Sequence, residues 1–437
     1  MVHPLEKIVD EDVEEGLEFL RDLMTKNILG ESALVKMQSF LRQAFGICKV
    51  SPRIIQVLGT NGKGSVVNQL VSILNCAGFS VGSTISPHLV EMNERCCINA
   101  VPIALNELGR FALRVKEICR SINLELPFPV AILAAATLCF IERGLDFIVL
   151  EAGLGGRNDA STAFENPEVI SLTSIGRDHE HILGKYPYEI IREKLAALRN
   201  NTSLVLGRYN FELRDFIENE TRKKAHKIIG LGQEFDYDKF NSLKYLPTEI
   251  LEFNLASKQR INANLGLEGK HQADNLAVAL QIASELGVDL SKLNLCSRTL
   301  NWGGRLERLY VNSLEWILDC AHNEEGVEVV ANHLNSLADG KYTVIFSGLG
   351  EKKLLSMIKL LQPVIDELFL YQMENHRAAD MQVLANELSS FEISSKIHIG
   401  SYRELIEKIY QRDNKNPVLV IGSVYLIGIT KVELSKI

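Results

Sequence analysis

The stretch from Arg53 to Gly78 limits what this chain can fold into more than any other part of its sequence. It opens with a short run of mainly apolar and β-branched residues, Ile54 to Leu58, which predicts a buried strand. The loop GTNGKGS follows at 59–65, and apolar residues then recur at helical spacing from Val66 onward. In such a strand–turn–helix unit the backbone N–H groups of the loop converge on an anion, and the start of the helix adds partial positive charge. We therefore predict a phosphate-binding loop, with Lys63 reaching a terminal phosphate.

The spacing of the glycines leaves one alternative open. The loop reads G-x-x-G-K-x-S, because Val57 stands where the usual eight-residue nucleotide motif has its first Gly. A tight Gly turn that binds no ligand would be compatible with the same spacing. The strand before the loop and the helix after it favour the phosphate-binding loop.

The composition indicates a soluble globular protein with more than one domain. A chain of 437 residues is too long for one ordinary core and predicts two or three domains, and 46% hydrophobic with 23% charged residues is typical of soluble proteins. The net charge of −8 argues against nucleic acid or an anionic membrane as a partner. There is no apolar run of membrane-spanning length, no signal-peptide core, and the eight cysteines lack metal-ligand spacing. These features predict a cytoplasmic protein with reduced thiols.

Strands and helices alternate along most of the chain, which predicts an α/β fold with a mainly parallel sheet. After the first strand, further strands are expected at 80–85, 146–151, 169–175 and 203–206. Helices are expected within 5–45 and at 106–122, 130–143, 188–199 and 272–286, with an irregular or strand-containing segment over 230–270.

A second, smaller α/β domain is predicted after the glycines of WGGR at 302–305. Its strands are expected at 316–319, 342–346, 367–371, 396–399 and 417–421. The predicted domains are therefore 1–300 and 306–437, joined by a linker at about 301–305.

Several polar residues fall just beyond predicted strands. In a parallel sheet the carboxyl ends of the strands meet at one edge, and ligands bind there. We therefore expect one shared site built from residues of independent motifs, namely Ser65, Ser86, Glu151, Asp178 and His179.

Six segments of the chain resemble the motifs of one protein family, both in sequence and in their order along the chain. They are GTNGKGS at 59–65, SPHLVEMNER at 86–95, LEAGLGGRNDA at 150–160, TSIGRDHEHILG at 173–184, REK at 192–194 and ILDCAHNEEG at 317–326. The chain resembles the folylpolyglutamate synthase/dihydrofolate synthase family of the Mur ligase superfamily. The resemblance implies a P-loop-containing N-terminal ATPase domain and a Rossmann-like C-terminal ligase domain. It also implies that ATP phosphorylates the carboxylate of an acceptor, that the amino group of glutamate attacks the acyl phosphate, and that the protein is a monomer.

The resemblance assigns metal and catalytic roles in the first domain. Two anions meet when a carboxylate attacks ATP, so Mg²⁺ and Lys63 would neutralise charge. The resemblance implies that Ser86 and Glu151 are ligands of one Mg²⁺, with Ser65 nearby, and that His179 is a ligand of a second Mg²⁺. The catalytic residues it implies are Lys63, His179 and Lys194, and Lys194 falls where many relatives carry a lysine carbamylated by CO₂.

The resemblance also implies which residues bind ATP. The loop residues are Gly59, Thr60, Asn61, Gly62, Lys63, Gly64 and Ser65. Beyond the loop it places Asn275 near the adenine end, Arg305 on the phosphates, Asp319 on the ribose hydroxyls and His322 close to the phosphates. A surface arginine that stabilises the loop between the domains is the alternative for Arg305.

Each metal and catalytic residue has a structural alternative. Ser86 could start a turn before Pro87, and Glu151 could be a core residue. Asp178 and His179 could be solvated loop residues, as His181 is expected to be. Lys194 could be an exposed helix lysine, because LAALR follows it where AGI and a basic residue are common in the family.

Two departures from the family pattern concern the acceptor. The segment 127–130 reads PFPV and lacks the Glu of an aromatic-Glu pair, and the loop reads GRNDAST where GRLDATN is common. Asp159 and Ala160 of that loop remain, and we assign them to the acceptor. We expect a ligase that joins L-glutamate to dihydropteroate and/or (tetrahydro)folate. The alternatives are a γ-glutamyl ligase of a non-folate acid, a catalytically weak ATP-binding relative, and a P-loop ATPase or kinase of another type.

Overall fold

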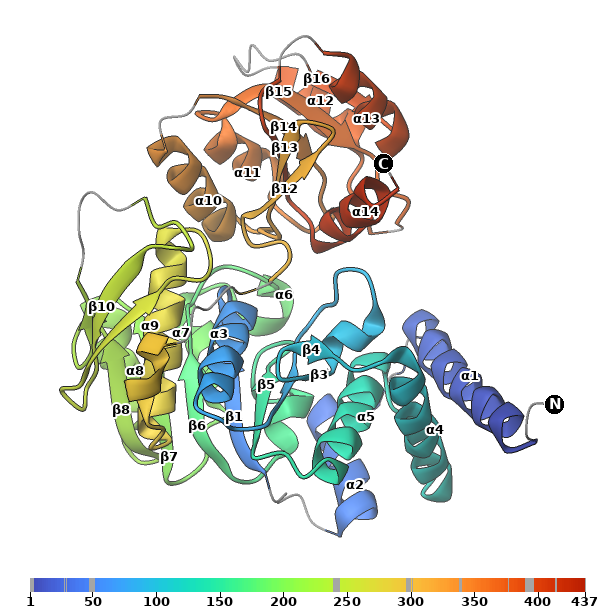
Figure 1. The fold of residues 1–437 in the computed structure, drawn as a ribbon, viewed down its shortest axis with the longest axis vertical. Coiled ribbons are helices and arrows are strands. Elements are labelled where there is room, and N and C mark those ends of the chain that lie inside the picture. The colour runs from blue at the N-terminus through green and yellow to red at the C-terminus, as the bar shows by residue number, and fades with distance from the viewer. Residues whose placement is uncertain are drawn as a thin grey trace. The chain divides into compact units, whose positions relative to one another are not determined.

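The computed structural model describes most of the chain: residues 4–26, 28, 30–46, 52–238, 244–295, 300, 302–337, 340–375, 377–389, 397–412 and 415–436. The described residues form two compact units. The first unit comprises those within 1–239, 250–264 and 273–300, and the second those within 240–249, 265–272 and 301–437. Asn301 of the predicted linker lies outside the described residues. Both units have α/β architecture, which confirms the predicted fold class (Figure 1).

The first unit contains an eight-stranded sheet with the order β4-β3-β2-β5-β1-β6-β7-β8 (Figure 1). Neighbouring strands from β2 to β8 in this order are parallel, and β3 and β4 extend the edge as an antiparallel hairpin. The strands are β1 (Arg53–Leu58), β2 (Val81–Thr84), β3 (Cys97–Ile98), β4 (Val101–Pro102), β5 (Phe147–Glu151), β6 (Pro167–Leu172), β7 (Thr202–Arg208) and β8 (Ala225–Leu231).

The helices of the first unit follow the predicted alternation. They are α1 (Pro4–Thr25), α2 (Ala33–Phe45), α3 (Lys63–Cys76), α4 (Leu105–Ser121), α5 (Phe128–Glu142), α6 (Glu180–Leu183), α7 (Pro187–Leu195), α8 (Phe211–Thr221) and α9 (Lys270–Glu285). Short 3₁₀ turns occur at η1 (Met92–Arg95), η2 (Ala160–Ala163) and η3 (Leu290–Leu295). Local sequence sets the ends of α2, because Ser32 accepts a hydrogen bond from Val35 N and Gly46 adopts a left-handed conformation after the last turn.

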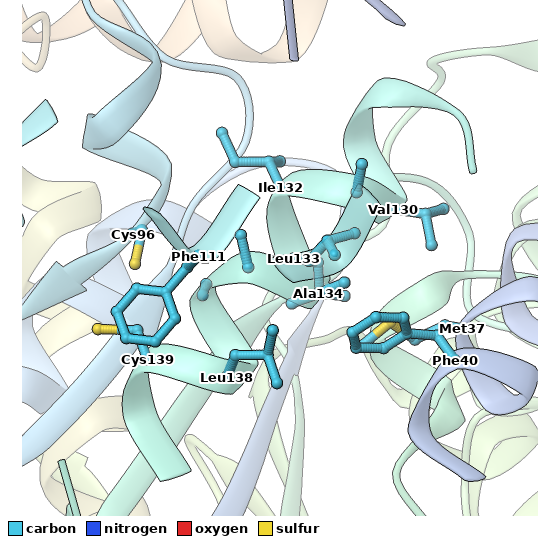
Figure 2. Close-up of a cluster of buried hydrophobic side chains, with 14 of the residues drawn as sticks. Met37, Phe40, Cys96, Phe111, Val130, Ile132, Leu133, Ala134, Leu138 and Cys139 are labelled. Atoms are coloured by element: carbon cyan, nitrogen blue, oxygen red, sulfur yellow. The ribbon is translucent and has the colours of Figure 1, made fainter. Parts of the chain in front are cut away.

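Helix α5 lies at the centre of the main core cluster of the first unit. It is apolar on nearly all sides, which is typical of a helix buried all round. Figure 2 shows its side chains between Cys96 and Phe111 on one side and Met37 and Phe40 on the other. Ile54 of β1 belongs to the same cluster, so α5 packs on the face of the sheet to which Ile54 points.

Three parts of the first unit differ from the predicted elements. Helix α7 ends at Leu195 rather than near 199, because the chain tightens into i→i+3 bonds and Arg199 donates to the carbonyl oxygens of Ala196 and Ala197. Helix α8 and strand β8 had no predicted counterpart. The uncertain segment 230–270 contains a three-stranded antiparallel sheet of β9 (Asp236–Tyr237), β10 (Ile250–Asn254) and β11 (Arg260–Asn264).

The second unit contains a six-stranded sheet with the order β12-β13-β17-β14-β15-β16. Its strands are β12 (Glu307–Val311), β13 (Leu314–Leu318), β14 (Tyr342–Phe346), β15 (Ile365–Tyr371), β16 (Ile397–Gly400) and β17 (Val418–Ile421). The strand β12, which was not predicted, pairs antiparallel with β13, and the other pairs are parallel. The helices are α10 (Glu324–Ser336), α11 (Leu354–Leu361), α12 (Met381–Ser389), α13 (Tyr402–Gln411) and α14 (Val424–Leu434).

Two further expectations concern membranes and cysteines. None of the helices in the described part of the chain is long and apolar enough to cross a membrane. The described cysteines are free thiols, and burial raises the pKa of Cys97 and Cys119 to about 12.

The second unit holds a buried carboxylate, Glu268, whose side chain is 3% exposed. Its two oxygens accept from Nε and Nη2 of Arg308, each at 2.7 Å, and Nε2 of His333 lies 3.0 Å from Oε1. Burial raises the pKa of Glu268, but hydrogen bonds and charge from Arg308 and His333 outweigh it and lower the pKa to about 2 from 4.5. The unfolded chain therefore binds more protons than the folded chain between about pH 4.5 and pH 2. The free energy of unfolding decreases as the pH is lowered through this window.

We predict that Glu268→Gln removes most of this pH dependence. The pKa shift corresponds to at most about 3 kcal/mol of stability, present at neutral pH and lost as Glu268 is protonated. Both tryptophans of the chain, Trp302 and Trp316, belong to the second unit, so urea unfolding followed by tryptophan fluorescence from pH 7 to pH 3 reports on it. The exposed Glu328→Gln on α10 is the control and should follow the wild-type curve. Identical curves for Glu268→Gln and wild type would contradict the assignment.

Candidate active site

The loop between β1 and α3 needs glycine at two positions. Gly59 and Gly62 have φ angles of +146° and +84°, which side chains rarely adopt. A Cβ atom on Gly59 would lie 1.9 Å from Thr173 Oγ1, and one on Gly62 would lie 2.5 Å from Asn275 Oδ1. The space beside the loop is therefore already filled by side chains, and Asn275 packs directly against the loop. The conformation of the loop is therefore constrained by neighbouring side chains as well as by its own glycines.

Two hydroxyl residues immediately after β6 hold the loop in place. Thr173 Oγ1 donates to the carbonyl oxygen of Asn61 at 2.6 Å. Ser174 Oγ accepts from Asn61 N at 2.9 Å, and Ser174 O accepts from Thr60 N at 2.9 Å. The sequence analysis missed both residues as parts of the site, although TSIGRDHEHILG was among the segments that it singled out. Hydroxyl residues at the end of the strand beside β1 were the available signal.

Two lysines meet at the phosphate loop from different helices. Lys63 begins α3, and its Nζ donates to Thr60 O at 3.0 Å. Lys194, in the last turn of α7, is only 3% exposed, and its Nζ donates to Gly59 O at 2.7 Å. The alternative of an exposed helix lysine is therefore wrong for Lys194.

The surroundings of Lys194 favour its neutral form. Burial, and after it the nearby charge of Lys63, lower the pKa of Lys194, and Asp159, Asp178 and Glu193 oppose the shift; the net pKa is about 7. A lysine in this state has an appreciable neutral fraction near pH 7. An uncharged amine is a nucleophile, which a protonated surface lysine is not.

The ends of β2 and β5 bring Ser86 and Glu151 together. Ser86 N donates to Glu151 Oε2 at 3.2 Å, so the carboxylate of Glu151 has a polar partner at the edge of the sheet. A Cβ atom on Gly153 would lie 3.8 Å from Ser86 Oγ and 3.5 Å from Asp159 Oδ2. The SPHL segment and the loop after β5 therefore converge at Gly153.

Asp159 shapes the glycine-rich loop that follows β5. Its Oδ1 accepts from the backbone N and the Oγ of Ser161, at 2.9 and 2.5 Å, and its Oδ2 accepts from Leu154 N at 2.9 Å. The next residue, Ala160, is buried at the start of η2. Asp159 therefore orders the loop from within, and its charge also acts on Lys194.

His179 lies at a strained position just before α6. Its φ angle is +49°, its backbone N donates to Asp178 Oδ1 at 2.8 Å, and its Nε2 is 3.8 Å from the same oxygen. The ring is partly exposed, whereas His181 is on the surface as expected. Asp178 is one of the charges that act on Lys194, so this loop belongs to the same part of the unit.

The unusual segment 127–130, which forms the N-terminus of α5, contacts the segment SPHLVEMNER at 86–95. The guanidinium of Arg95 lies 5.1 Å from the ring centroid of Phe128, and Arg95 Nε donates to Nδ1 of His88 at 2.9 Å. Phe128 is largely buried. Sequence reasoning noted the change in this segment but did not identify its partners, because they lie far apart along the chain.

Arg305, Asp319 and His322 form a separate group within the second unit. The Asp319 carboxylate is 4% exposed and accepts from Leu306 N at 2.9 Å and from Ala321 N at 2.8 Å. Burial raises the pKa of Asp319, and the nearby positive charge of Arg305 opposes this. Arg305 Nη1 donates to Gly304 O at 2.8 Å, and His322 Nδ1 lies 2.9 Å from Cys320 O. The three residues therefore gather around the carboxyl end of β13.

The donor chemistry of the first unit fits a hard cation. Ser65, Ser86 and Glu151 offer hydroxyl and carboxylate oxygens, which Mg²⁺ prefers, and Mg²⁺ retains several waters. The described residues contain no group of three or more His, Cys, Asp or Glu side chains arranged to hold a metal.

Two family models match the chain across both units. The Mur ligase middle domain matches residues 57–283, and the Mur ligase glutamate ligase domain matches residues 304–424. This chain belongs to the Mur ligase family. The dihydrofolate synthase/folylpolyglutamate synthase of Bacillus subtilis is 32% identical over 390 residues, which cover 86% of this chain and 89% of that relative.

Solved structures of Mur ligase family members have the same fold. The folylpolyglutamate synthase of Thermotoga maritima has a TM-score of 0.81 and 26% identity, with 96% of each chain covered. The bifunctional folylpolyglutamate synthase/dihydrofolate synthase of Yersinia pestis complexed with AMPPNP and Mn ion has a TM-score of 0.81 and 24% identity, with 97% of this chain and 98% of that chain covered. Given its two Mur ligase domains and these relatives, the chain is an ATP-dependent ligase. The resemblance inferred from the sequence is confirmed.

We predict that Thr173→Val weakens nucleotide binding by this Mur ligase about fivefold. The change keeps the shape of the side chain but removes the hydroxyl hydrogen bond to Asn61 O, and losing a buried bond of this kind costs about 1 kcal/mol. Calorimetric titration with ADP measures the effect. Thr137→Val is the matched control, because it removes an equally buried hydroxyl bond to Leu133 O inside α5, away from the loop. Equal ADP affinity in the two variants would show that the Thr173 hydroxyl does not hold the phosphate loop in its binding conformation.

Proposed function

We propose that this chain joins L-glutamate to the carboxyl group of a folate-type acceptor, dihydropteroate and/or (tetrahydro)folate. The observation that carries the proposal is the convergence of the phosphate loop, the buried Lys194 and the loop of Asp159 within one unit, together with near full-length similarity to a dihydrofolate synthase/folylpolyglutamate synthase. The protein is proposed to act as a monomer.

The reaction has two steps. A carboxylate oxygen of the acceptor attacks the γ-phosphorus of ATP, and ADP leaves with the electrons of the broken P–O bond. The amino group of glutamate then attacks the acyl carbon, loses a proton and releases inorganic phosphate, which leaves an amide. The first step brings two anions together, so positive charge and N–H donors aimed at the phosphate lower its barrier. In this chain the backbone N–H groups at the start of α3 and the ammonium of Lys63 would supply both.

We propose two divalent cation sites beside this loop. A bound Mg²⁺ would neutralise the negative charge shared by phosphate and carboxylate. Ser65, Ser86 and Glu151 would hold one cation, and the bond from Ser86 N to Glu151 supports this pairing because it keeps the two segments side by side. His179 would hold the second cation, with its ring orientation set by the strained backbone at the start of α6.

We also propose that Lys194 is carbamylated. Its neutral amine would attack CO₂, form an N–C bond and lose a proton to water, giving a carbamate with an anionic oxygen. Burial of the amine and its pKa of about 7 support this step, because the neutral fraction reacts. The modification would also replace a cation near Lys63 by an anion, which is the more favourable arrangement of charge beside cations.

Each unit contains residues that we assign to nucleotide binding. We propose that Asn275, which packs beside Gly62, contacts the nucleotide near its adenine end. We assign Arg305 and His322 to the phosphates and Asp319 to the ribose hydroxyls. Each Asp319 oxygen accepts a backbone N–H in the structure, and a carboxylate oxygen can accept a further hydrogen bond.

Asp159 and Ala160 are assigned to the acceptor. A γ-glutamyl ligase of a non-folate acid is the second candidate, and the observation that favours it is the apolar segment 127–130, where Phe128 packs against Arg95. The two candidates share all steps of the reaction and differ only in the acceptor.

The first test is the dependence of ADP release on substrates. We expect ADP release only when both L-glutamate and an acceptor are present, with radiolabelled glutamate incorporated into dihydropteroate or tetrahydrofolate. Lys63→Ala should lower turnover at least ~10²-fold, because it removes a preorganised charge at the transferred phosphoryl group. Incorporation into another carboxylate alone would favour the second candidate. ADP release without glutamate would refute the ligase reaction for this chain.

The second test concerns the carbamate. Lys194→Ala should be nearly inactive, and a small carboxylic acid at millimolar concentration should restore part of the rate by supplying the missing anionic oxygen. Lys194→Arg should remain inactive, because guanidinium does not form the carbamate. The exposed Lys223→Ala is the control and should keep wild-type activity with no response to added acid. A carbamate resonance in protein equilibrated with isotope-labelled CO₂ reports the modification directly, and full activity in Lys194→Ala would rule it out as necessary.

A further inference from the structure

Gln56 is a polar residue inside an apolar strand at the interior of the sheet. It lies on β1 between Leu150 of β5 and Ile170 of β6, and its side chain is 1% exposed. A primary amide buried in this way costs free energy unless hydrogen bonds satisfy it. Side chains alternate along a strand, so Gln56 points to the same face as Ile54, the face covered by α5 and η2.

The amide group of Gln56 binds two hydroxyls of the loop after β5. Its Nε2 donates to Ser161 Oγ and to Thr162 Oγ1, each at 2.8 Å. Both hydroxyls donate onward, Ser161 to Asp159 Oδ1 at 2.5 Å and Thr162 to Gly156 O at 2.8 Å. The direction of donation is therefore set along the whole chain of bonds. Only a donor at position 56 can complete it, because the hydrogens of both hydroxyls are already used.

The loop that Gln56 holds packs tightly against the end of α7. A Cβ atom on Gly156 would lie 2.3 Å from Lys194 O, and Arg157 N donates to Glu193 O at 3.1 Å. Lys194 in turn extends its amine to Gly59 O, three residues after Gln56 in the chain. The contacts therefore form a closed path that starts on β1, passes through the loop and α7, and returns to the end of β1.

We infer that Gln56 is a positioning residue that holds the 153–162 loop and α7 against the phosphate loop. Through this path it sets the place of Asp159 and keeps the amine of Lys194 buried. The phosphate loop itself has a separate brace in Thr173 and Ser174. Loss of the Gln56 amide therefore disturbs the acceptor side of the site and leaves nucleotide binding in place. The part of this inference that concerns the acceptor rests on the proposed function.

A purely structural amide would affect stability alone, so the test uses a second buried glutamine. Gln56→Leu removes the donors with little change in volume. Gln281→Leu on α9 is the matched control, because Gln281 is also fully buried, accepts from Ala256 N at 3.0 Å and donates to Glu285 Oε1 at 3.0 Å. Thermal unfolding of both variants measures how much stability is lost when a buried amide is removed at either position.

The decisive readout is the reactivity of Lys194. The protein is treated with an amine-acylating reagent in CO₂-depleted buffer, and modification of the Lys194 peptide is followed by mass spectrometry. We expect Lys194 to react at least about tenfold faster in Gln56→Leu than in wild type, and at the wild-type rate in Gln281→Leu, because only the first variant frees α7 from its support. Equal rates for Lys194 in the two variants would overturn the inference.

Kinetics provide the second readout. In Gln56→Leu we expect KM for the acceptor to rise about tenfold and KM for ATP to stay within about twofold of wild type. An equal rise in KM for the acceptor and KM for ATP would refute the inference that Gln56 supports the acceptor side of the site and not nucleotide binding. If Gln56→Leu does not fold, the double variant Ser161→Ala/Thr162→Val removes the same two bonds, together with the onward bonds to Asp159 Oδ1 and Gly156 O, and the same change in the Lys194 labelling rate is expected. The labelling needs neither ATP nor acceptor, so a wild-type protein without ligase activity would refute the proposed function while the rates at Lys194 still decide the role of Gln56.

Discussion

The hydrogen bonds between the phosphate loop and the two residues that follow β6 are the interaction on which the rest of this site depends. A glycine-rich loop has many accessible conformations, and it becomes an anion site only when one conformation is enforced. Thr173 and Ser174 enforce it here by bonding both backbone groups of Asn61. Gly59 and Gly62 are needed because neighbouring side chains occupy the space where their Cβ atoms would lie. The loop is thus shaped from outside as much as by its own sequence.

Charge is distributed unevenly around this loop. Lys63 and Lys194 approach it from two helices, whereas Glu151, Asp159 and Asp178 lie at the ends of neighbouring strands and loops. A buried lysine beside another lysine is unfavourable in its charged form, and this is why the pKa of Lys194 falls to about 7. The same burial that destabilises the ammonium increases the neutral fraction of the amine near pH 7. Position and reactivity of Lys194 therefore have one physical cause.

The second unit satisfies its buried carboxylates in two different ways. Glu268 is compensated by the cationic Arg308 and by His333, and its pKa falls. Asp319 is held by two backbone N–H groups, which do not offset the cost of burial, and its pKa rises. The contrast suits different roles. Glu268 ties chain segments together, whereas Asp319 orders the backbone at the end of β13, where ligands bind in α/β folds.

The sequence by itself determined the phosphate loop, the alternation of strands and helices in both units, and the family. Each of these depends on a local pattern: glycine spacing beside Lys63, apolar periodicity, or short motifs such as GRNDA at 156–160. The sequence did not predict α8, β8 or β12, where apolar periodicity is weak, or the early end of α7.

Only the tertiary structure decided which polar residues surround the loop. Lys194 reads as an exposed helix lysine in isolation, and its burial follows from the loop packed on α7. Thr173 and Ser174 stand in the TSIGRDHEHILG motif and Gln56 in none, but the sequence does not show what these residues bond, because their partners lie far away in the chain. Local patterns determine which elements form. The distant contacts that bury an amine or bond an amide are set only when the elements pack together.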